Sequence, residues 1–129
     1  MVSPQLTARI DSQNGVGSIA LSGELDIVTV SVLEGHLAPF ENDGVAAIMV
    51  DLQDLVFTDT TGIRAFLQAR DRVTTSGRRL ILVGAGPSVR RLFQLTGTED
   101  LLDDGDAAGV LHRFAAGAEG EAVDDHSDH

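Results

Sequence analysis

The chain has 129 residues, no cysteine, and a formal net charge of −11 at pH 7 from 20 acidic and nine basic side chains. This length predicts one domain, and a hydrophobic content of 43% is enough to build a buried core. The negative charge excludes nucleic-acid binding through a basic surface and membrane binding through a polybasic patch. Without cysteine or lysine there is no disulfide, thiol catalysis, thiolate metal site or Schiff-base chemistry.

The first residues do not resemble a targeting segment, because Met1 to Pro4 carries no positive stretch followed by an apolar one. The longest uninterrupted apolar run, Val45 to Val50, is far shorter than the ~20 residues that span a bilayer. We therefore expect a soluble, cytoplasmic protein with no membrane partner.

Two short β-prone runs open the chain, Leu6–Ile10 and Val16–Leu21, and the pair Asn14 and Gly15 lies between them. An Asn-Gly pair between two such runs is typical of a tight hairpin turn. The sequence therefore predicts that the fold opens with an antiparallel hairpin.

A helix is predicted next, because four apolar residues recur at steps of three or four and so share one helix face: Val30, Leu33, Leu37 and Phe40. Pro39 near its end, and the segment Asn42–Gly44 after it, are the expected stop signals. The continuously apolar run Val45–Val50 follows, with Asp51 closing it. Such a run is typical of a strand buried on both faces.

A second helix is predicted after Asp59, with Ser76 and Gly77 as its stop and one stripe of residues facing inward: Ile63, Phe66, Leu67, Arg70 and Val73. A second buried strand is predicted at Leu80–Val83, followed by a turn at Gly84–Pro87.

The remaining elements follow that turn. A third helix begins after Pro87, with Val89, Leu92 and Phe93 at helical spacing, and Thr96 and Gly97 end it. Leu101 and Leu102 are interpreted as a short edge strand. A last helix is predicted from Asp106 to Ala116, with four residues buried: Ala107, Val110, Leu111 and Phe114.

Strand–helix alternation after an opening hairpin predicts an α/β fold with a mixed central sheet of four to five strands, covered by about four helices. We expect residues 1–117 to form this domain. Residues 118–129 are predicted to be a disordered acidic tail, since Glu119 to His129 holds five acids and no Lys or Arg. Without those five charges the net charge would be −6 instead of −11.

Few residues suggest catalysis, and we predict no enzymatic activity, no cofactor and no metal. The tail segment Asp125–His129 could chelate a metal weakly, but a solvated terminus is the better interpretation. Gly84 and Gly86 follow a strand and precede a helix, as in a phosphate-binding loop. Val89 stands where a dinucleotide fingerprint has its third glycine, so an ordinary tight turn is favoured there over nucleotide binding.

The densest polar signal is the segment Phe57–Ile63, between a buried strand and an amphipathic helix. Asp and Thr at this position are good helix caps. A hydroxyl at a helix N-terminus is also suited to phosphorylation, because free N–H groups and the helix dipole tolerate the phosphate. Gly62 costs about 1 kcal/mol in a helix, which suggests that another surface approaches closely. From these residues alone capping is favoured over a phosphorylation switch.

Three segments resemble the STAS domain, specifically the bacterial anti-sigma factor antagonists. Gly23–Asp26 is similar to the family's Gly-Glu-Leu/Ile-Asp. Phe57–Ile63 is similar to Phe-x-Asp-Ser-Ser/Thr-Gly-Leu/Ile, and Val89–Gly97 to Val-x-Arg-Leu-Phe-x-Leu-Ser/Thr-Gly. Their order and spacing agree over about residues 5 to 116, so the resemblance implies the STAS fold.

The resemblance implies partner switching. An antagonist of this family binds an anti-sigma factor, which is also a GHKL-type serine/threonine kinase, and so frees a sigma factor. The kinase phosphorylates the hydroxyl after the signature Asp, the complex dissociates, and a phosphatase resets the cycle. The acceptor would be Thr60, with Thr61 as the second candidate. The implied partner surface comprises Asp26, Thr58, Asp59, Thr60, Thr61, Gly62 and Arg64.

The family usually has serine at the acceptor position, where this chain has Thr60. A STAS adaptor or scaffold subunit of a larger transport or signalling complex, without phosphorylation, is therefore an alternative. A small-ligand module at the Gly84–Pro87 turn is another. A phospho-aspartate receiver domain is rejected, because it needs a lysine. The sigma factor, the inducing signal and the oligomeric state are left open by the sequence.

Overall fold

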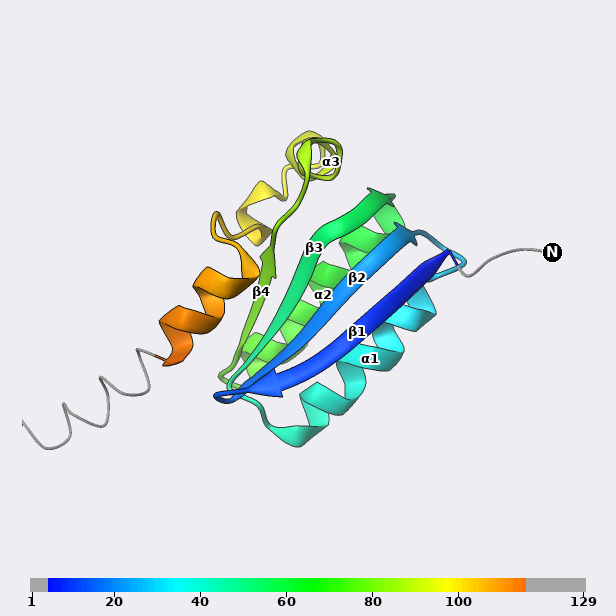
Figure 1. Cartoon of the computed structure of the whole chain (residues 1–129). Coiled ribbons are helices and arrows are strands. Elements are labelled where there is room, and N and C mark those ends of the chain that lie inside the picture. Colours follow the sequence, from blue (N-terminus) through cyan, green and yellow to red (C-terminus); the bar gives the residue numbers. More distant parts are fainter. Residues whose placement is uncertain (1–4, 116–129) are drawn as a thin grey trace, which may run out of the picture.

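The chain opens with an antiparallel hairpin of β1 (Leu6–Gln13) and β2 (Val16–Leu25), in a computed structural model that describes residues 5–115 (Figure 1). Asn14 and Gly15 both have left-handed backbone angles, with φ of 56° and 78°. These angles are those of a type I′ turn, which needs positive φ at both positions and matches the twist of the two strands. The predicted hairpin is confirmed.

Two parallel strands complete a four-stranded sheet, β3 (Ala47–Thr58) and β4 (Arg79–Val83), in the order β1-β2-β3-β4. The predicted mixed α/β sheet is therefore confirmed, with the lower of the two strand numbers in residues 5–115. The edge strand predicted at Leu101 and Leu102 is wrong. Leu101 ends the 3-10 helix η1 (Glu99–Leu101), and Leu102 forms a single isolated bridge to Leu82.

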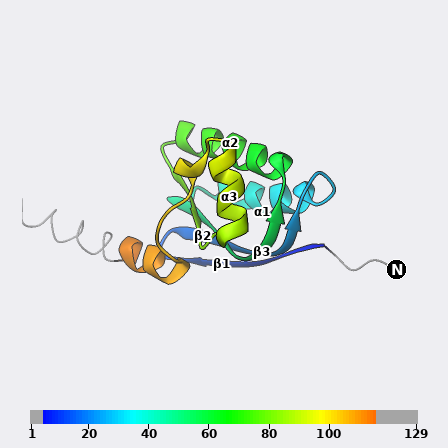
Figure 2. The same cartoon turned by 90° about the horizontal axis from the view of Figure 1, so that it is seen from above.

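One face of the sheet is covered by α1 (Val30–Asp43) and α2 (Thr60–Thr75), which lie side by side (Figure 2). Leu33 and Leu37 of α1 are fully buried, as their spacing predicts. Pro39 lies inside this helix and does not stop it, whereas the predicted stop at Asn42–Gly44 is confirmed. The helix continues to Asp43 and ends at Gly44, whose φ of 74° is the left-handed conformation that stops helices.

A third helix, α3 (Pro87–Leu95), follows β4 and lies across the end of β3 (Figure 1). Val89 and Phe93 are buried, as predicted. The Phe93 ring lies 6.4 Å from the ring of Phe66 in α2, a distance within the range of favourable aromatic pairs. This contact joins α3 to the main core.

The second face of the sheet is covered in part by a helix over residues 107–115 (Figure 1). Val110 is fully buried there in a small cluster with residues of β2, β3 and β4. Arg113 pairs with Asp103 at 3.2 Å, and the guanidinium of Arg79 lies 5.7 Å from the ring of Phe114. The predicted last helix is confirmed over this range, but of its four residues predicted to be buried only Val110 is, and Ala107, Leu111 and Phe114 are half-buried. Ala116, the predicted tail and the segment Asp125–His129 lie outside the described residues.

The strand β3 is longer than predicted, because it continues through Asp51 to Thr58. Beyond Asp51 the burial alternates irregularly: Leu52, Leu55 and Thr58 are buried, and the residues between them are exposed. Two register shifts accompany this stretch on the partner strand β2, between Ala20 and Ser22 and between Gly23 and Glu24. The extension brings the segment Phe57–Ile63, called the signature segment below, to the edge of the sheet where β2 ends.

Candidate functional site

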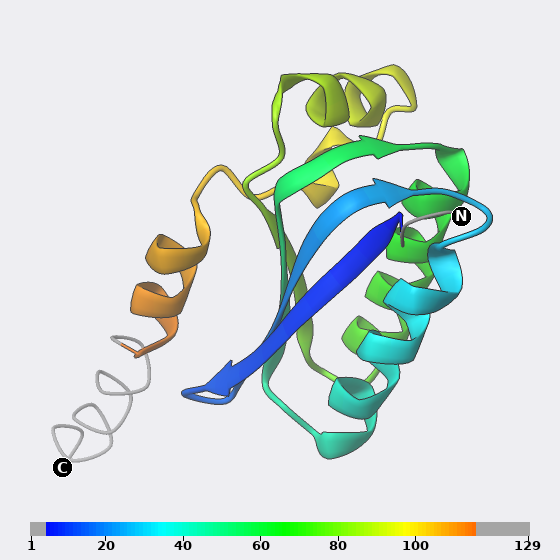
Figure 3. The same ribbon diagram turned by 45° about the vertical axis from the view of Figure 1, so that its right-hand side comes forward.

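The signature segment lies where the carboxyl ends of β2 and β3 meet (Figure 3). The backbone N–H of Asp59 donates a hydrogen bond of 3.1 Å to the carbonyl oxygen of Leu25. This bond places the first residues of α2 beside the turn that leads from β2 into α1. Two segments that are about 30 residues apart in sequence therefore form one surface.

Asp59 caps α2. Its Oδ1 accepts a hydrogen bond of 3.2 Å from the backbone N–H of Gly62, and its carbonyl oxygen accepts one from Ile63. These are the bonds expected of an N-cap residue, which satisfies N–H groups that have no partner within the helix. The capping interpretation is confirmed, and the cap fixes the backbone of the next two residues.

Gly62 permits a close approach within the chain itself. A Cβ at this position would overlap Oγ1 of Thr58, and it would lie 2.7 Å from Cδ2 of Leu25. The close approach predicted from Gly62 therefore exists, but the approaching surface is the end of β2 and β3. Both Thr58 and Gly62 are buried in the free chain, and their direct contact with a partner stays a prediction.

Thr60 is the first residue of α2, and its side chain is exposed, whereas Thr61 is half-buried. Among residues 5–115, no group is placed to form a hydrogen bond with the Thr60 hydroxyl. Arg64 is exposed one helical turn further along, at the i+4 spacing that places side chains on one helix face. It forms no ion pair in the described part of the chain.

Asp26 organises the turn between β2 and α1. Its Oδ1 accepts hydrogen bonds from the backbone N–H groups of Val28 at 2.9 Å and Thr29 at 3.0 Å. The buried Thr29 hydroxyl in turn donates to the carbonyl oxygen of Glu24 at 2.9 Å. The half-buried Asp26 side chain thus stabilises the conformation of this turn.

The turn presents two apolar side chains that the sequence analysis missed, Ile27 and Val28, which are 74% and 75% exposed. Phe57, at the end of β3, is also partly exposed. Apolar residues with this much exposure, next to one another, are typical of an interaction surface. A signal was present in the sequence, since Asp26 and Thr29 are residue types preferred at turns and helix N-caps, which places Ile27 and Val28 before the start of α1.

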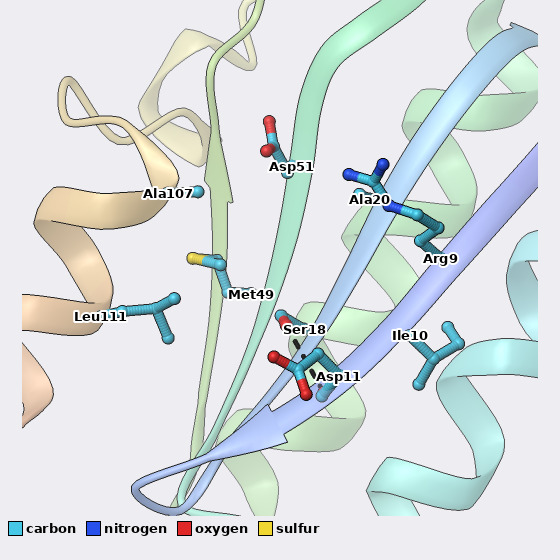
Figure 4. Close-up of a pocket in the computed structure, with 9 residues that line it drawn as sticks. All are labelled: Arg9, Ile10, Asp11, Ser18, Ala20, Met49, Asp51, Ala107 and Leu111. Carbon is cyan, nitrogen blue, oxygen red and sulfur yellow. Dashed lines mark hydrogen bonds between the residues drawn. The ribbon is translucent and has the colours of Figure 1, made fainter.

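Two hollows lie away from this surface. The first has a volume of about 300 Å³ and lies on the second face of the sheet (Figure 4), where Arg9 and Asp51 are placed on either side of Ala20. The second, of about 510 Å³, adjoins the Gly84–Pro87 turn. Its charged lining residues are Arg90, Asp103, Asp104 and Asp106. Three carboxylates against one guanidinium disfavour a phosphate, which argues against nucleotide binding at this turn.

None of the helices within residues 5–115 combines the length and apolar character that crossing a lipid bilayer requires.

The family model of the STAS domain matches residues 7–110. The anti-sigma-B factor antagonist of Staphylococcus aureus is 31% identical over 97 residues, which cover 75% of this chain and 90% of that protein. An anti-sigma factor antagonist from Mycobacterium paratuberculosis has the same fold, with a TM-score of 0.76, 24% identity, and coverage of 89% of this chain and 99% of that one. The phosphorylated form of the Bacillus cell fate determinant SpoIIAA also matches, with a TM-score of 0.67, 22% identity, and coverage of 83% and 98%. The chain belongs to the STAS domain family, among the anti-sigma factor antagonists.

Proposed function

We propose that this protein binds an anti-sigma factor through the surface around Thr60 and thereby releases a sigma factor. The observation that carries the proposal is the exposed Thr60 hydroxyl at the capped start of α2, beside the exposed apolar pair Ile27 and Val28. The relative from Staphylococcus aureus is named an anti-sigma-B factor antagonist, which supports the same class of partner. Regulation of a sigma factor also implies a cytoplasmic location.

We infer that phosphorylation of Thr60 ends this interaction. The donor would be a GHKL-type serine/threonine kinase activity of the anti-sigma factor, which transfers the γ-phosphoryl group of ATP to the hydroxyl oxygen. A phosphatase would hydrolyse the phosphothreonine and restore binding. SpoIIAA, which has a similar fold, has been solved in a phosphorylated form, and this supports modification in proteins of this fold.

Electrostatics explains why the phosphate would separate the partners but leave the fold intact. A phosphate on Thr60 adds about −1.5 to −2 charges next to the Asp59 carboxylate, at an interface that excludes water on binding. A loss of about 3 kcal/mol of binding free energy would weaken the complex more than a hundredfold. Within the free chain the positive end of α2 stabilises the same phosphate.

Arg64 adds a second route to release. Its i+4 spacing from Thr60 allows the guanidinium to pair with a phosphate on that residue. In the unmodified chain the same guanidinium is available for a carboxylate of the partner. Phosphorylation would then remove an attractive contact as well as add a repulsive one.

The test compares Thr60→Ala, Thr60→Glu and the control Ser12→Glu, which adds the same charge at an exposed position of β1. The anti-sigma factor of the source organism is titrated against each variant by calorimetry. We expect Thr60→Ala and Ser12→Glu to bind like the unmodified chain, and Thr60→Glu to bind at least tenfold more weakly. Equal affinities for all three variants would contradict the interface.

A kinase assay separates the switch from the adaptor alternative. The anti-sigma factor and ATP are incubated with the unmodified chain and with Thr60→Ala, and the phosphorylated residue is located by mass spectrometry. Phosphate on Thr60 supports the switch. If neither Thr60 nor Thr61 is modified and binding persists in ATP, the protein acts as an adaptor that is not regulated in this way.

A further inference from the structure

An apolar groove lies beside the proposed partner surface, between the end of β3 and α3. Its volume is about 190 Å³, and its lining residues are Val56, Phe57, Thr58, Ser88, Val89, Arg91, Leu92 and Leu95. Thr58 and Val89 are buried, whereas Val56 and Leu95 are 65% and 69% exposed. Nothing in residues 5–115 covers these two side chains, so the groove is an open apolar surface.

The size and the lining of the groove suit a protein side chain better than a small ligand. Pockets for small molecules usually measure about 300–1,000 Å³ and carry a few convergent polar groups. This groove is smaller, and apart from Arg91 its exposed walls are largely apolar. An apolar side chain from a partner would fill it and bury Val56 and Leu95 at the same time.

Arg91 indicates the charge that a partner would place next to the groove. It is exposed at the groove and forms no ion pair within residues 5–115, whereas the adjacent Arg90 pairs with Glu99 at 3.3 Å. Arg91 therefore presents an exposed positive charge at the edge of an otherwise largely apolar groove. A carboxylate on the partner is the group that would complement it.

The groove is continuous with the surface around Thr60, because Phe57 and Thr58 line it and directly precede the cap residue Asp59. We propose that it receives an apolar side chain of the anti-sigma factor, next to a carboxylate that pairs with Arg91. This inference rests on the proposed function and adds an anchoring contact outside the phosphorylation site. Buried apolar anchors, together with an arginine, typically supply most of the affinity of an interface.

The test uses the full chain, with Leu95→Asp and Arg91→Glu as groove variants and Arg9→Glu as the matched control. Arg9 is also exposed and without an ion pair in the described residues, but it lies on the second face of the sheet. All three changed side chains are exposed, so the fold should persist, and circular dichroism checks it. By calorimetry with the anti-sigma factor, we expect each groove variant to bind about tenfold more weakly and Arg9→Glu to stay within about twofold.

The binding test distinguishes three negative results. If the unmodified chain binds the anti-sigma factor and both groove variants bind as tightly, the groove inference is wrong and the proposed function stands. If the unmodified chain does not bind any anti-sigma factor, the proposed function itself fails. If sedimentation shows that Leu95→Asp converts a dimer into a monomer with unchanged anti-sigma affinity, the groove holds a second copy of this chain, and the proposal is overturned.

Discussion

Replacing Gly62 by alanine tests the internal packing of the site, because helix propensity and packing predict opposite effects. Alanine favours a helix over glycine by up to about 1 kcal/mol. Against this gain, the new Cβ would overlap Oγ1 of Thr58 and lie 2.7 and 2.8 Å from Cδ2 and Cγ of Leu25. Leu25 is fully buried and Thr58 nearly so, hence neither can move into solvent.

The size of the effect follows from these contacts. Overpacking a core usually costs about 1–3 kcal/mol, and contact with two buried side chains places this site at the upper end. After the helix-propensity gain, we expect Gly62→Ala to lower the free energy of unfolding by about 2 kcal/mol. For a domain of this size that corresponds to a fall in Tm of roughly 8 °C.

Gly35→Ala is the matched control. Gly35 lies inside α1, is exposed, and a Cβ there would meet nothing within 4 Å. The same chemical change should therefore raise the free energy of unfolding by up to about 1 kcal/mol. Urea unfolding followed by far-ultraviolet circular dichroism measures both variants, since the chain has no tryptophan or tyrosine. A Gly62→Ala protein as stable as the unmodified chain, but impaired in partner binding, would show that the glycine serves docking instead.

Three other changes have expected outcomes in the same urea assay. Asp59→Ala removes the cap of α2 and should lower the free energy of unfolding by about 1 kcal/mol, and Asp59→Ser should restore most of that stability. Unchanged stability in Asp59→Ala would show that the cap bond contributes nothing. Arg78→Ala removes hydrogen bonds to three backbone carbonyls around the end of α1 and should lower the free energy of unfolding by about 2 kcal/mol. Arg78→Lys should restore only part of this stability, and full recovery by lysine would contradict a role for the guanidinium in binding all three carbonyls. Burial acts to raise the pKa of Asp103, but hydrogen bonds from Gly105 and Arg113 outweigh it, so the native pKa lies below the ordinary value of 3.8. The unfolded chain then binds more protons than the native one, so the free energy of unfolding falls as the pH drops below about 5 toward the native pKa. Asp103→Asn should reduce that fall. The same pH dependence of stability in Asp103→Asn and the unmodified chain would refute the lowered pKa of Asp103.

Much of the fold could be predicted because its local signals agree with its tertiary contacts. The Asn14 and Gly15 turn, the Leu33 and Leu37 helix face and the Asp59 cap all appear in the structure as their residue types predict. Each depends on interactions between residues that are close in sequence. Such interactions are determined by local spacing and backbone preference, so they are readable without a structure.

The errors arise where a distant contact overrides the local signal. Asp51 suggests the end of a strand, yet β3 continues for seven residues because β2 provides backbone partners up to Leu25. Leu101 and Leu102 look like an edge strand, but only Leu102 reaches Leu82.

The same limit applies to the candidate site. The sequence locates the signature segment, but burial separates its residues into two groups. Thr58 and Gly62 pack inward against the end of β2, whereas Thr60 and Arg64 face solvent. The apolar pair Ile27 and Val28 joins this surface only through the Asp26 turn, and that turn depends on hydrogen bonds between side chains and backbone. Exposure is a property of the assembled fold, so residue types alone did not reveal it.

The exposed position of Thr60 bears on how regulation can change over evolutionary time. Its neighbours Asp59 and Gly62 are constrained by the stability of the domain, whereas no hydrogen bond within residues 5–115 constrains the Thr60 side chain. Under the proposed function, a single substitution at this position would create, weaken or remove the phosphorylation site without disturbing the scaffold. If the proposal holds, a regulated switch and a constitutive adaptor would differ by one substitution, and both would keep the same fold.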